Sequence, residues 1–490
     1  MPRSARPRPR TSLLAAYRCA ALPLLLATCA AGGCGERGRV PAVRGVVVIS
    51  LDALGAKHVG AYGYERDTTP ALDDFAAQGV LFERAYTQQV WTLTSHVTMM
   101  SGLYPKTHGA SKRGPARPGA TMLAEVLHDA GFATAAFTGA GGYMKPGFGL
   151  GRGFDVYGTN RATERGGRAV ARWLRERARI RALDPAHRFF LFLHFYDVHS
   201  DEGTDLPYDA PPAFRARFLP DGLDWKRRGD TYMLMGMQVR GDVDDHDREV
   251  LRSLYDAGVL HADQRRLAPV LRLLDELGLA RDTLVVVTSD HGEELFEHGR
   301  TTHQQPYEET ARVPLVARGP GLPAGARVPA LVELVDLMPT VLDLLGLPIP
   351  AHVQGESLLP LVAGETPRTP DAHVDGVMDG LAGEYPSGLV RDIDGVAWSL
   401  IANVGSRGEG PARRYRITGA PELYRLDRDA GQQHDLARSE PARTAELSRA
   451  VLAWFARNEV AGRALGEAGD HPDLLTEAER AQLRALGYSE

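Results

Sequence analysis

Short apolar segments alternate with helical, glycine-ended segments along most of this chain, and that alternation constrains its fold more than any other feature. Five runs read as buried strands, at residues 45–52, 132–139, 188–199, 283–294 and 313–321. Helical stretches at residues 69–79, 121–131 and 268–278 each end at a glycine. Buried strands separated by helices are typical of an α/β fold, so we expect a large, mostly parallel sheet covered by helices.

The pattern changes after about residue 370. Short segments at residues 395–404, 412–419 and 421–429 precede a helical stretch at residues 443–458, which predicts a small antiparallel sheet with a helix against it. With 490 residues, the chain is long enough for one large domain at 46–370 and a smaller subdomain at 371–490. Residues 201–245 are rich in proline, glycine and charge, and we interpret them as a long insertion that is a candidate for a lid over the substrate.

Residues 1–34 have the composition of an export signal, followed by a linker at residues 35–45. Arginines without acids precede an apolar run at residues 19–31 that is too short to span a bilayer. The leader also resembles that of a bacterial lipoprotein, with Cys34 as the first choice for the lipid-modified cysteine and Cys29 as the second. A plain secretory signal is the alternative. We therefore expect an exported protein of the cell envelope or periplasm, associated with the membrane only through an N-terminal lipid anchor.

The cysteine content and charge exclude several kinds of chemistry. All 3 cysteines, Cys19, Cys29 and Cys34, lie in the leader, so the rest of the chain offers no disulfide, thiolate ligand or cysteine nucleophile. The formal net charge is −5, and the leader carries arginines but no acid, so the mature chain is more acidic still. This sign of charge argues against a nucleic-acid partner.

Residues able to bind metals follow three of the predicted strands. They are Asp52, Asp197 with His199, and Asp290 with His291. Each alone is explained as a helix cap or an ordinary surface or core residue. In open α/β sheets, however, ligands bind at the carboxyl ends of the strands, where separate segments meet at one edge. The five residues together therefore predict a site at this edge.

A hydroxyl-rich segment, "TLTSHVTMMSG" at residues 92–102, predicts a helix that begins near Thr92 and ends at Gly102. The free N–H groups and the dipole at a helix N-terminus favour an anion such as sulfate or phosphate. A hydroxyl at this position and next to a divalent cation becomes nucleophilic near neutral pH. The alternative is that Thr94 or Ser95 only caps the helix.

These segments resemble the sulfatase branch of the alkaline phosphatase superfamily, from about residue 46 to the end of the chain. The resemblance is carried by "SLDALGAKHVGAYGYERDTTPALDDFAAQGVLFERAYT", "TLTSHVTMMSGLYPKTHG", "DHGEELFEHGRTTHQQPYEETARVPLVARGPG" and "ELYRLDRDAGQQHDLA". Their order and spacing make the match specific. It implies a large mixed, mostly parallel sheet between helices, with a smaller C-terminal antiparallel sheet and helix.

The resemblance assigns a nucleophile. The family motif Cys-x-Pro-Ser-Arg begins at the residue that matches Thr92, and Thr94, Ser95 and His96 stand where it has proline, serine and arginine. Sulfatases convert the cysteine or serine to formylglycine, which threonine cannot form. Threonine is the nucleophile of the related phosphoethanolamine transferases, lipoteichoic acid synthases and nucleotide phosphodiesterases. Thr92 is therefore the predicted nucleophile, and Ser95 is the reserve.

The resemblance also implies a metal site of Asp52, Thr92, Asp290 and His291. This set has few oxygens and one imidazole, which suits zinc or manganese better than calcium. A second ion or a general acid near the leaving group would involve His199 and His303, with Asp197 completing a second site, so we expect one or two divalent ions. His298 and His108 match the family as well and are expected to be structural.

Two residues that bind sulfate in the family are missing from this sequence. Ala53 replaces a second aspartate, and "TGAGGY" is all that represents the Gly-Lys-Trp-His block. We expect a metal-dependent hydrolase of sulfate or phosphate esters that acts on a small-molecule, glycan or lipid ester. The alternatives are a phosphotransferase that resembles the phosphoethanolamine transferases, and a degenerate sulfatase fold that only binds.

Overall fold

The computed structural model of the chain describes residues 43–111, 114–139, 142–159, 164–200, 204–219, 227–366, 371–377, 384–408 and 410–467. The predicted leader, with Cys29 and Cys34, lies outside the described residues, as does most of the predicted linker. Within the described ranges, no helix combines the length and the apolar character that crossing a membrane requires.

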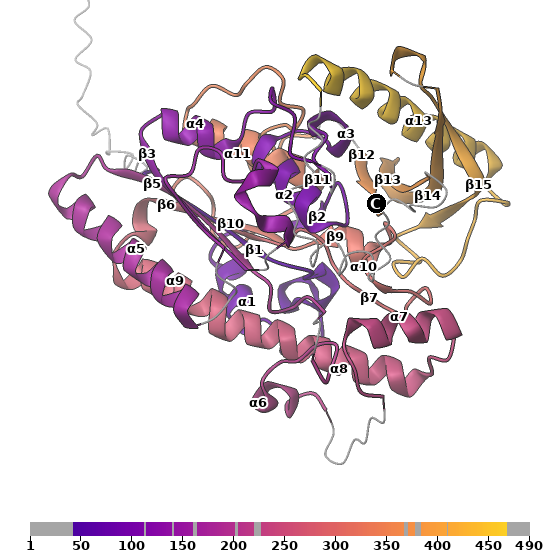
Figure 1. The fold of residues 1–490 in the computed structure, drawn as a ribbon, viewed down its shortest axis with the longest axis horizontal. Coiled ribbons are helices and arrows are strands. Elements are labelled where there is room, and N and C mark those ends of the chain that lie inside the picture. Colours follow the sequence, from indigo (N-terminus) through magenta and orange to yellow (C-terminus); the bar gives the residue numbers. More distant parts are fainter. Residues whose placement is uncertain are drawn as a thin grey trace, which may run out of the picture. The chain divides into compact units, whose positions relative to one another are not determined.

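A mixed, mostly parallel sheet forms the centre of the fold, in the order β11-β2-β10-β6-β1-β5-β3-β4, with β9 paired to β2 (Figure 1). β1 pairs in parallel with both β5 and β6, whereas β10 runs antiparallel to β6 and β2. The predicted fold class is confirmed. The strands are β1 (Gly45–Leu51), β2 (Val80–Tyr86), β3 (Phe132–Thr138), β4 (Val156–Gly158), β5 (Arg188–Phe195), β6 (Thr283–Thr288), β9 (Arg312–Val313), β10 (Leu315–Arg318) and β11 (Ala326–Glu333).

Helices cover both faces of this sheet, which explains why its strands are apolar without alternation. Side chains alternate between the faces along each strand. Val46 and Val48 of β1 therefore pack with α2, α4 and α11, whereas Val47 and Ile49 pack with α1, α5, α8 and α9 on the other face. All four valine and isoleucine side chains are fully buried.

The helices differ widely in length. Those around the sheet are α1 (Pro70–Ala77), α2 (Thr92–Ser101), α3 (Pro105–His108), α4 (Leu123–Asp129), α5 (Glu164–Leu183), α6 (Pro212–Arg215), α7 (Thr231–Arg240), α8 (Asp245–Ala262), α9 (Ala268–Glu276), α10 (Glu308–Ala311), α11 (Leu337–Leu344) and α12 (Leu359–Val362). A π-helical turn at Asp263–Leu267 joins α8 to α9.

A second, antiparallel sheet follows, as predicted, with a long helix against it. Its strands pair in the order β12-β13-β14-β15, and they are β12 (Asp371–Asp375), β13 (Tyr385–Ile393), β14 (Val396–Arg407) and β15 (Arg414–Arg425). Leu447, Val451 and Phe455 of α13 (Pro441–Ala464) pack against Leu400 and Leu423 of the sheet. A ribbon of two short strands, β7 (Glu294–Leu295) and β8 (Thr301–Thr302), lies in the loop after β6.

Several elements of the structure differ from those predicted from the sequence. The segments at 412–419 and 421–429 belong to one strand, β15. The predicted insertion at 201–245 contains two helices, α6 and α7; α7 is capped by Asp230, whose carboxylate accepts from the Tyr232 N–H, and ends at Gly241. Strands β2 and β11 were not predicted, because charged or proline residues interrupt their apolar pattern.

Candidate metal centre and active site

Four predicted ligand residues lie together at the carboxyl edge of the main sheet. Asp52 follows β1, and Asp290 and His291 follow β6, its parallel neighbour. Thr92 is the first residue of α2. The His291 Nε2 atom lies 3.4 Å from Thr92 Oγ1, 3.4 Å from Asp290 Oδ2 and 3.7 Å from Asp52 Oδ1. Three segments far apart in the sequence thus present four polar atoms to one buried point.

The orientation of these atoms suits a cation. Within the described part of the chain, Asp52 Oδ1 and Asp290 Oδ2 are buried and accept no hydrogen bond. Their partner oxygens are occupied, because Asp52 Oδ2 contacts His194 Nε2 at 2.9 Å and Asp290 Oδ1 accepts from the Ala53 N–H at 3.2 Å. His291 Nδ1 donates to the Gly292 carbonyl at 2.9 Å, which leaves Nε2 with a lone pair. Asp52, Asp290 and His291 are among the groups close enough to share an ion.

Burial without a cation perturbs all three groups. It raises the pKa of Asp290 to about 6, with a further contribution from the neighbouring Asp52 carboxylate. It raises the pKa of Asp52 well above its usual value and lowers the pKa of His291 well below. Two neighbouring buried carboxylates, each with one oxygen that accepts no hydrogen bond, are costly unless positive charge joins them. The donor set therefore fits a divalent cation.

The backbone next to Asp52 has an uncommon conformation. Ala53 has a φ of 60°, in the left-handed region that non-glycine residues rarely adopt. This conformation directs the Ala53 N–H at Asp290 Oδ1, and the Ala53 carbonyl accepts from the Tyr255 hydroxyl at 2.6 Å. Strain of this kind persists where surrounding contacts hold it and is common at functional sites.

Two histidines that the sequence analysis did not assign complete the surroundings of the site. His194 on β5 contacts Asp52, as described above, and His96 on α2 donates from Nδ1 to the Thr92 carbonyl at 2.7 Å. Both are fully buried, and with Asp290 they form another group that could hold an ion. The only signal for His194 was an ionisable residue inside an otherwise apolar strand; His96 stands where the family motif has arginine.

His199 and His303 face each other beside these ligands. Their Nε2 atoms are 3.1 Å apart, and the His303 ring stacks on His291 with centroids 4.0 Å apart. His303 Nδ1 donates to the Val90 carbonyl and His199 Nδ1 to the Ser200 carbonyl. Two opposed Nε2 lone pairs require a proton or a cation between them. Burial and the neighbouring His303 lower the pKa of His199 to about 3, so neither ring is a strong base by itself.

Asp197 does not join this pair, which corrects the predicted second site. Both oxygens of its carboxylate accept from Arg266 Nε, at 2.9 and 3.0 Å, and Oδ1 lies 3.3 Å from His261 Nδ1. The hydrogen bonds from His261 and Arg266, together with the charge of Arg266, hold the pKa of Asp197 below its ordinary value despite burial. Its charge is already satisfied by α8 and the π-helical turn, so the second site reduces to His199 and His303.

Ser95 is not the cap of α2. Trp91 occupies the N-cap position, and no side chain caps the helix. The Ser95 hydroxyl donates instead to the Asp290 carbonyl at 2.8 Å and contacts the Thr87 hydroxyl at 2.9 Å. Ser95 thus ties the nucleophile helix to the loop that carries Asp290 and His291. Its hydroxyl is committed to these two bonds, which speaks against the reserve nucleophile.

We expect Ser95→Ala to lower the free energy of unfolding by about 1 kcal/mol, because one buried hydrogen bond to the Asp290 carbonyl is lost. Urea denaturation of the metal-loaded protein measures the change. The maximal rate should stay within about tenfold of that of the wild type, since the ligand atoms are untouched. A loss as large as that expected for Thr92→Ala would instead make Ser95 the nucleophile.

His298 and His108 are held by partners away from the converging ligands. His298 Nδ1 pairs with Glu309 at 2.6 Å, and its ring stacks on Tyr307. His108 Nδ1 accepts from the Ala110 N–H, and its Nε2 contacts the Thr98 hydroxyl at 3.1 Å. These contacts agree with the structural roles expected for both.

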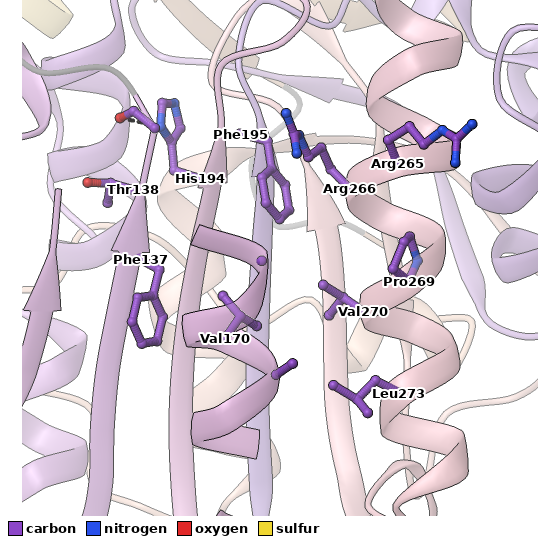
Figure 2. Close-up of a pocket in the computed structure, with 13 residues that line it drawn as sticks. Phe137, Thr138, Val170, His194, Phe195, Arg265, Arg266, Pro269, Val270 and Leu273 are labelled. Carbon is purple, nitrogen blue, oxygen red and sulfur yellow. Dashed lines mark hydrogen bonds between the residues drawn. The ribbon is translucent and has the colours of Figure 1, made fainter. Parts of the chain in front are cut away.

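A pocket lies between the carboxyl ends of β3 and β5 and the helices α5 and α9 (Figure 2). Its lining includes the apolar side chains of Phe137, Val170 and Leu273 and the basic side chains of Arg265 and Arg266. Two residues that contact Asp52 line it: His194, through its ring, and Phe195, whose carbonyl accepts from the Asp52 N–H. It is distinct from the point where Thr92 and its neighbours meet.

Comparison with known proteins decides the family. The sequence matches the Sulfatase family model over residues 44–347, which is more than half of the chain. The chain belongs to the sulfatase family. This sulfatase is 26% identical over 361 residues to arylsulfatase K of Rattus norvegicus, an alignment that covers 66% of this chain and 64% of the rat protein. The chain thus spans less than two thirds of that relative.

Solved structures show the same fold for this sulfatase. A protein from a study of glycosaminoglycan metabolism by Bacteroides thetaiotaomicron aligns with a TM-score of 0.65 and 20% identity, covering 86% of this chain and 97% of that one. A phosphonate monoester hydrolase from Silicibacter pomeroyi aligns with a TM-score of 0.62 and 22% identity, covering 85% and 96%. By their names, the rat protein is an arylsulfatase and the Silicibacter protein is a phosphonate monoester hydrolase.

Proposed function

We propose that the chain is a metal-dependent hydrolase of sulfate or phosphate esters, with Thr92 as its nucleophile. One observation carries the proposal: two buried carboxylate oxygens without hydrogen-bond partners, Asp52 Oδ1 and Asp290 Oδ2, face the His291 lone pair and the Thr92 hydroxyl. A binding module has no need for a hydroxyl at such a point. Zinc or manganese suits two carboxylates, one imidazole and one hydroxyl better than calcium does.

A divalent cation held by Asp52, Asp290 and His291 would supply positive charge that lowers the pKa of the Thr92 hydroxyl and attracts the anionic head of the ester. Thr92 is 6% exposed, whereas Asp52, Asp290 and His291 are fully shielded from water. It stands at the first position of α2, where backbone N–H groups without helical partners favour an anion. These groups stabilise negative charge that grows on the transferred group in the transition state.

The reaction proceeds in two steps. The Thr92 hydroxyl gives up its proton to solvent, and its oxygen forms a bond to sulfur or phosphorus while the bond to the leaving oxygen breaks. The proton held between His199 Nε2 and His303 Nε2 passes to the leaving oxygen, and the histidine pair regains a proton from solvent. Water then attacks the Thr92 ester, releases sulfate or phosphate and returns the threonine hydroxyl. His303 serves as the acid: its Nδ1–H is committed to the Val90 carbonyl, so the proton that it gives up is the one that its Nε2 shares with His199 Nε2, 3.1 Å away.

The relatives support this range of esters without deciding between them. One is named an arylsulfatase, one a phosphonate monoester hydrolase, and another structure contains D-glucosamine-2-N,6-O-disulfate as substrate. Ala53, at the position of the family's second aspartate, and threonine at position 92 favour phosphate-type esters. The composition of residues 1–34 supports export to the cell envelope.

A product analysis tests the proposal. The purified chain is loaded with zinc, manganese or calcium and offered matched 4-nitrophenyl sulfate, phosphate and phosphonate esters, with and without an alcohol acceptor. Release of inorganic anion that the acceptor does not alter supports hydrolysis. Transfer to the alcohol in place of release would establish a phosphotransferase. A chain that binds no divalent ion after dialysis and cleaves no ester would be a binding module.

We expect His303→Ala to slow the cleavage of esters with poor leaving groups, such as alkyl esters, by roughly 10²–10⁴-fold, because the acid that protonates the leaving oxygen is lost. 4-Nitrophenolate leaves without being protonated, so the cleavage of 4-nitrophenyl esters should slow far less. Steady-state rates with both esters measure the difference. His434→Ala is the control, since that side chain is 83% exposed and pairs only with Asp429. Equal slowing of both esters would contradict the assignment of His303.

A further inference from the structure

A turn at the end of β12, at residues 375–377, reaches from the C-terminal sheet to the segment before the nucleophile. The Asp375 N–H donates to the Gln88 carbonyl at 2.9 Å, and the Val90 N–H donates to the Asp375 carbonyl at 3.0 Å. Gln89 and Asp375 form a parallel bridge. The Asp375 carboxylate is itself anchored, because it accepts from the Ser387 hydroxyl at 2.8 Å. The loop that leads into Thr92 is thus fixed by a distant part of the chain.

The same turn holds His303 from two sides. On one side, the His303 ring donates to the Val90 carbonyl at 2.8 Å, and Val90 is bound to Asp375 as described. On the other side, the Val377 N–H donates to the carbonyl of Gln304, the residue after His303, at 3.0 Å. Hydrogen bonds from this one turn therefore fix the positions of both the ring and the backbone of His303.

Gly376 lies at the centre of the turn and leaves no room for a side chain. A Cβ atom there would lie 2.6 Å from the Gln304 carbonyl oxygen and 2.9 Å from Pro386 Cβ. Its N–H donates to the Pro386 carbonyl at 2.7 Å, and its carbonyl accepts from the Gln89 side chain at 3.3 Å. The need for glycine is steric, and the nearest atom is backbone next to His303.

We propose that Gly376 is a positioning residue for His303, whose Nε2 it keeps aligned with the leaving oxygen by allowing the turn to pack against Gln304. This inference rests on the proposed function, in which His303 acts at the leaving group. A methyl group at position 376 pushes the Gln304 backbone away and tilts the imidazole, while the ligands Asp52, Asp290 and His291 keep their own supports on the main sheet.

The test compares Gly376→Ala with Gly431→Ala in the full chain. Gly431 is the matched control, because its nearest non-neighbouring atom to an added Cβ is Gln433 Cγ at 3.8 Å. Metal content, melting temperature and kcat/KM are measured with a 4-nitrophenyl ester and an alkyl ester of the same acid. We expect Gly376→Ala to retain its metal and to lose at least about tenfold more kcat/KM on the alkyl ester than on the 4-nitrophenyl ester. Gly431→Ala should behave as the wild type.

A double variant separates positioning from general damage. If Gly376 acts through His303, adding Gly376→Ala to His303→Ala should cause little further loss on the alkyl ester. Additive losses, or equal slowing of both esters by Gly376→Ala, would overturn the inference while leaving the proposed function intact. Equal slowing of both esters by His303→Ala alone would refute the role of His303 itself and with it the inference.

A milder variant covers the case in which Gly376→Ala does not fold. Gln89→Ala removes only the side-chain bond to the Gly376 carbonyl. We expect the same preference, a larger loss on the alkyl ester than on the 4-nitrophenyl ester, at a smaller magnitude. Equal effects on the two esters would again overturn the inference.

Discussion

Thr92→Ala is expected to lower kcat by roughly 10³-fold or more, because the residual rate without a nucleophile comes only from binding and charge stabilisation. The hydroxyl faces His291 Nε2 at 3.4 Å in a buried site, so water has no equivalent position from which to attack. Metal content should fall little, since Asp52, Asp290 and His291 remain. Stopped assays with metal-loaded variant and wild type measure the rate, and metal analysis runs in parallel.

Two controls sharpen this experiment. Thr92→Ser keeps the hydroxyl and should retain much of the activity, whereas Thr94→Ala removes a neighbouring hydroxyl that donates to the Trp91 carbonyl and should cost little activity. Mass spectrometry of rapidly quenched wild type should locate the transferred group on the peptide that contains Thr92. An unchanged rate in Thr92→Ala would exclude Thr92 as the nucleophile.

The second large effect concerns the metal. His291→Ala should weaken binding of zinc or manganese by more than about 100-fold. Loss of a residue that only hydrogen-bonds to a metal ligand costs up to about 100-fold in affinity, and loss of the ligand itself should cost more. Turnover should be abolished at micromolar metal. The physical reason is that Asp52 Oδ1 and Asp290 Oδ2 then face no imidazole and hold the ion with two carboxylates alone. Metal titration with and without a competing chelator measures the affinity.

Thermal melting gives an independent readout of the same site. Metal at 1,000 times its dissociation constant should stabilise the wild type by about 4 kcal/mol, because it binds only the folded chain. His291→Ala should show little of this increase. His298→Ala is the matched control, since its partners are Glu309 and the Gln432 carbonyl, away from the ligands. If metal raised the melting temperature of His291→Ala as much as that of the wild type, the proposed ligand set would be wrong.

Much of the site could be predicted because its residues follow local rules. Asp52, Asp290 and His291 come directly after strands that are buried on both faces, and parallel neighbouring strands deliver such residues to one edge. The start of α2 at Thr92 follows from a run of hydroxyls that ends at Gly102, which has a φ of 63°. The main sheet and the C-terminal sheet follow from the same periodicities.

The remaining features depend on contacts between distant segments. Asp197 looked like a ligand by its position after β5, but Arg266, on a π-helical turn far along the chain, neutralises it. His194 sits inside an apolar strand, and only its pairing with β1 reveals that its ring reaches Asp52. Strand β10 runs antiparallel to β6, a direction that an apolar run alone does not encode.

The hydrogen bonds between β12 and the loop before Thr92 can form only late in synthesis. Every proposed metal ligand and the attacking threonine leave the ribosome before β12, which begins at Asp371, and N-terminal parts generally fold first. A nascent or prematurely terminated chain thus carries the reactive groups without the turn that braces Val90 and Gln304. The support that aligns His303 with the leaving oxygen is therefore completed only when β12 has joined the fold.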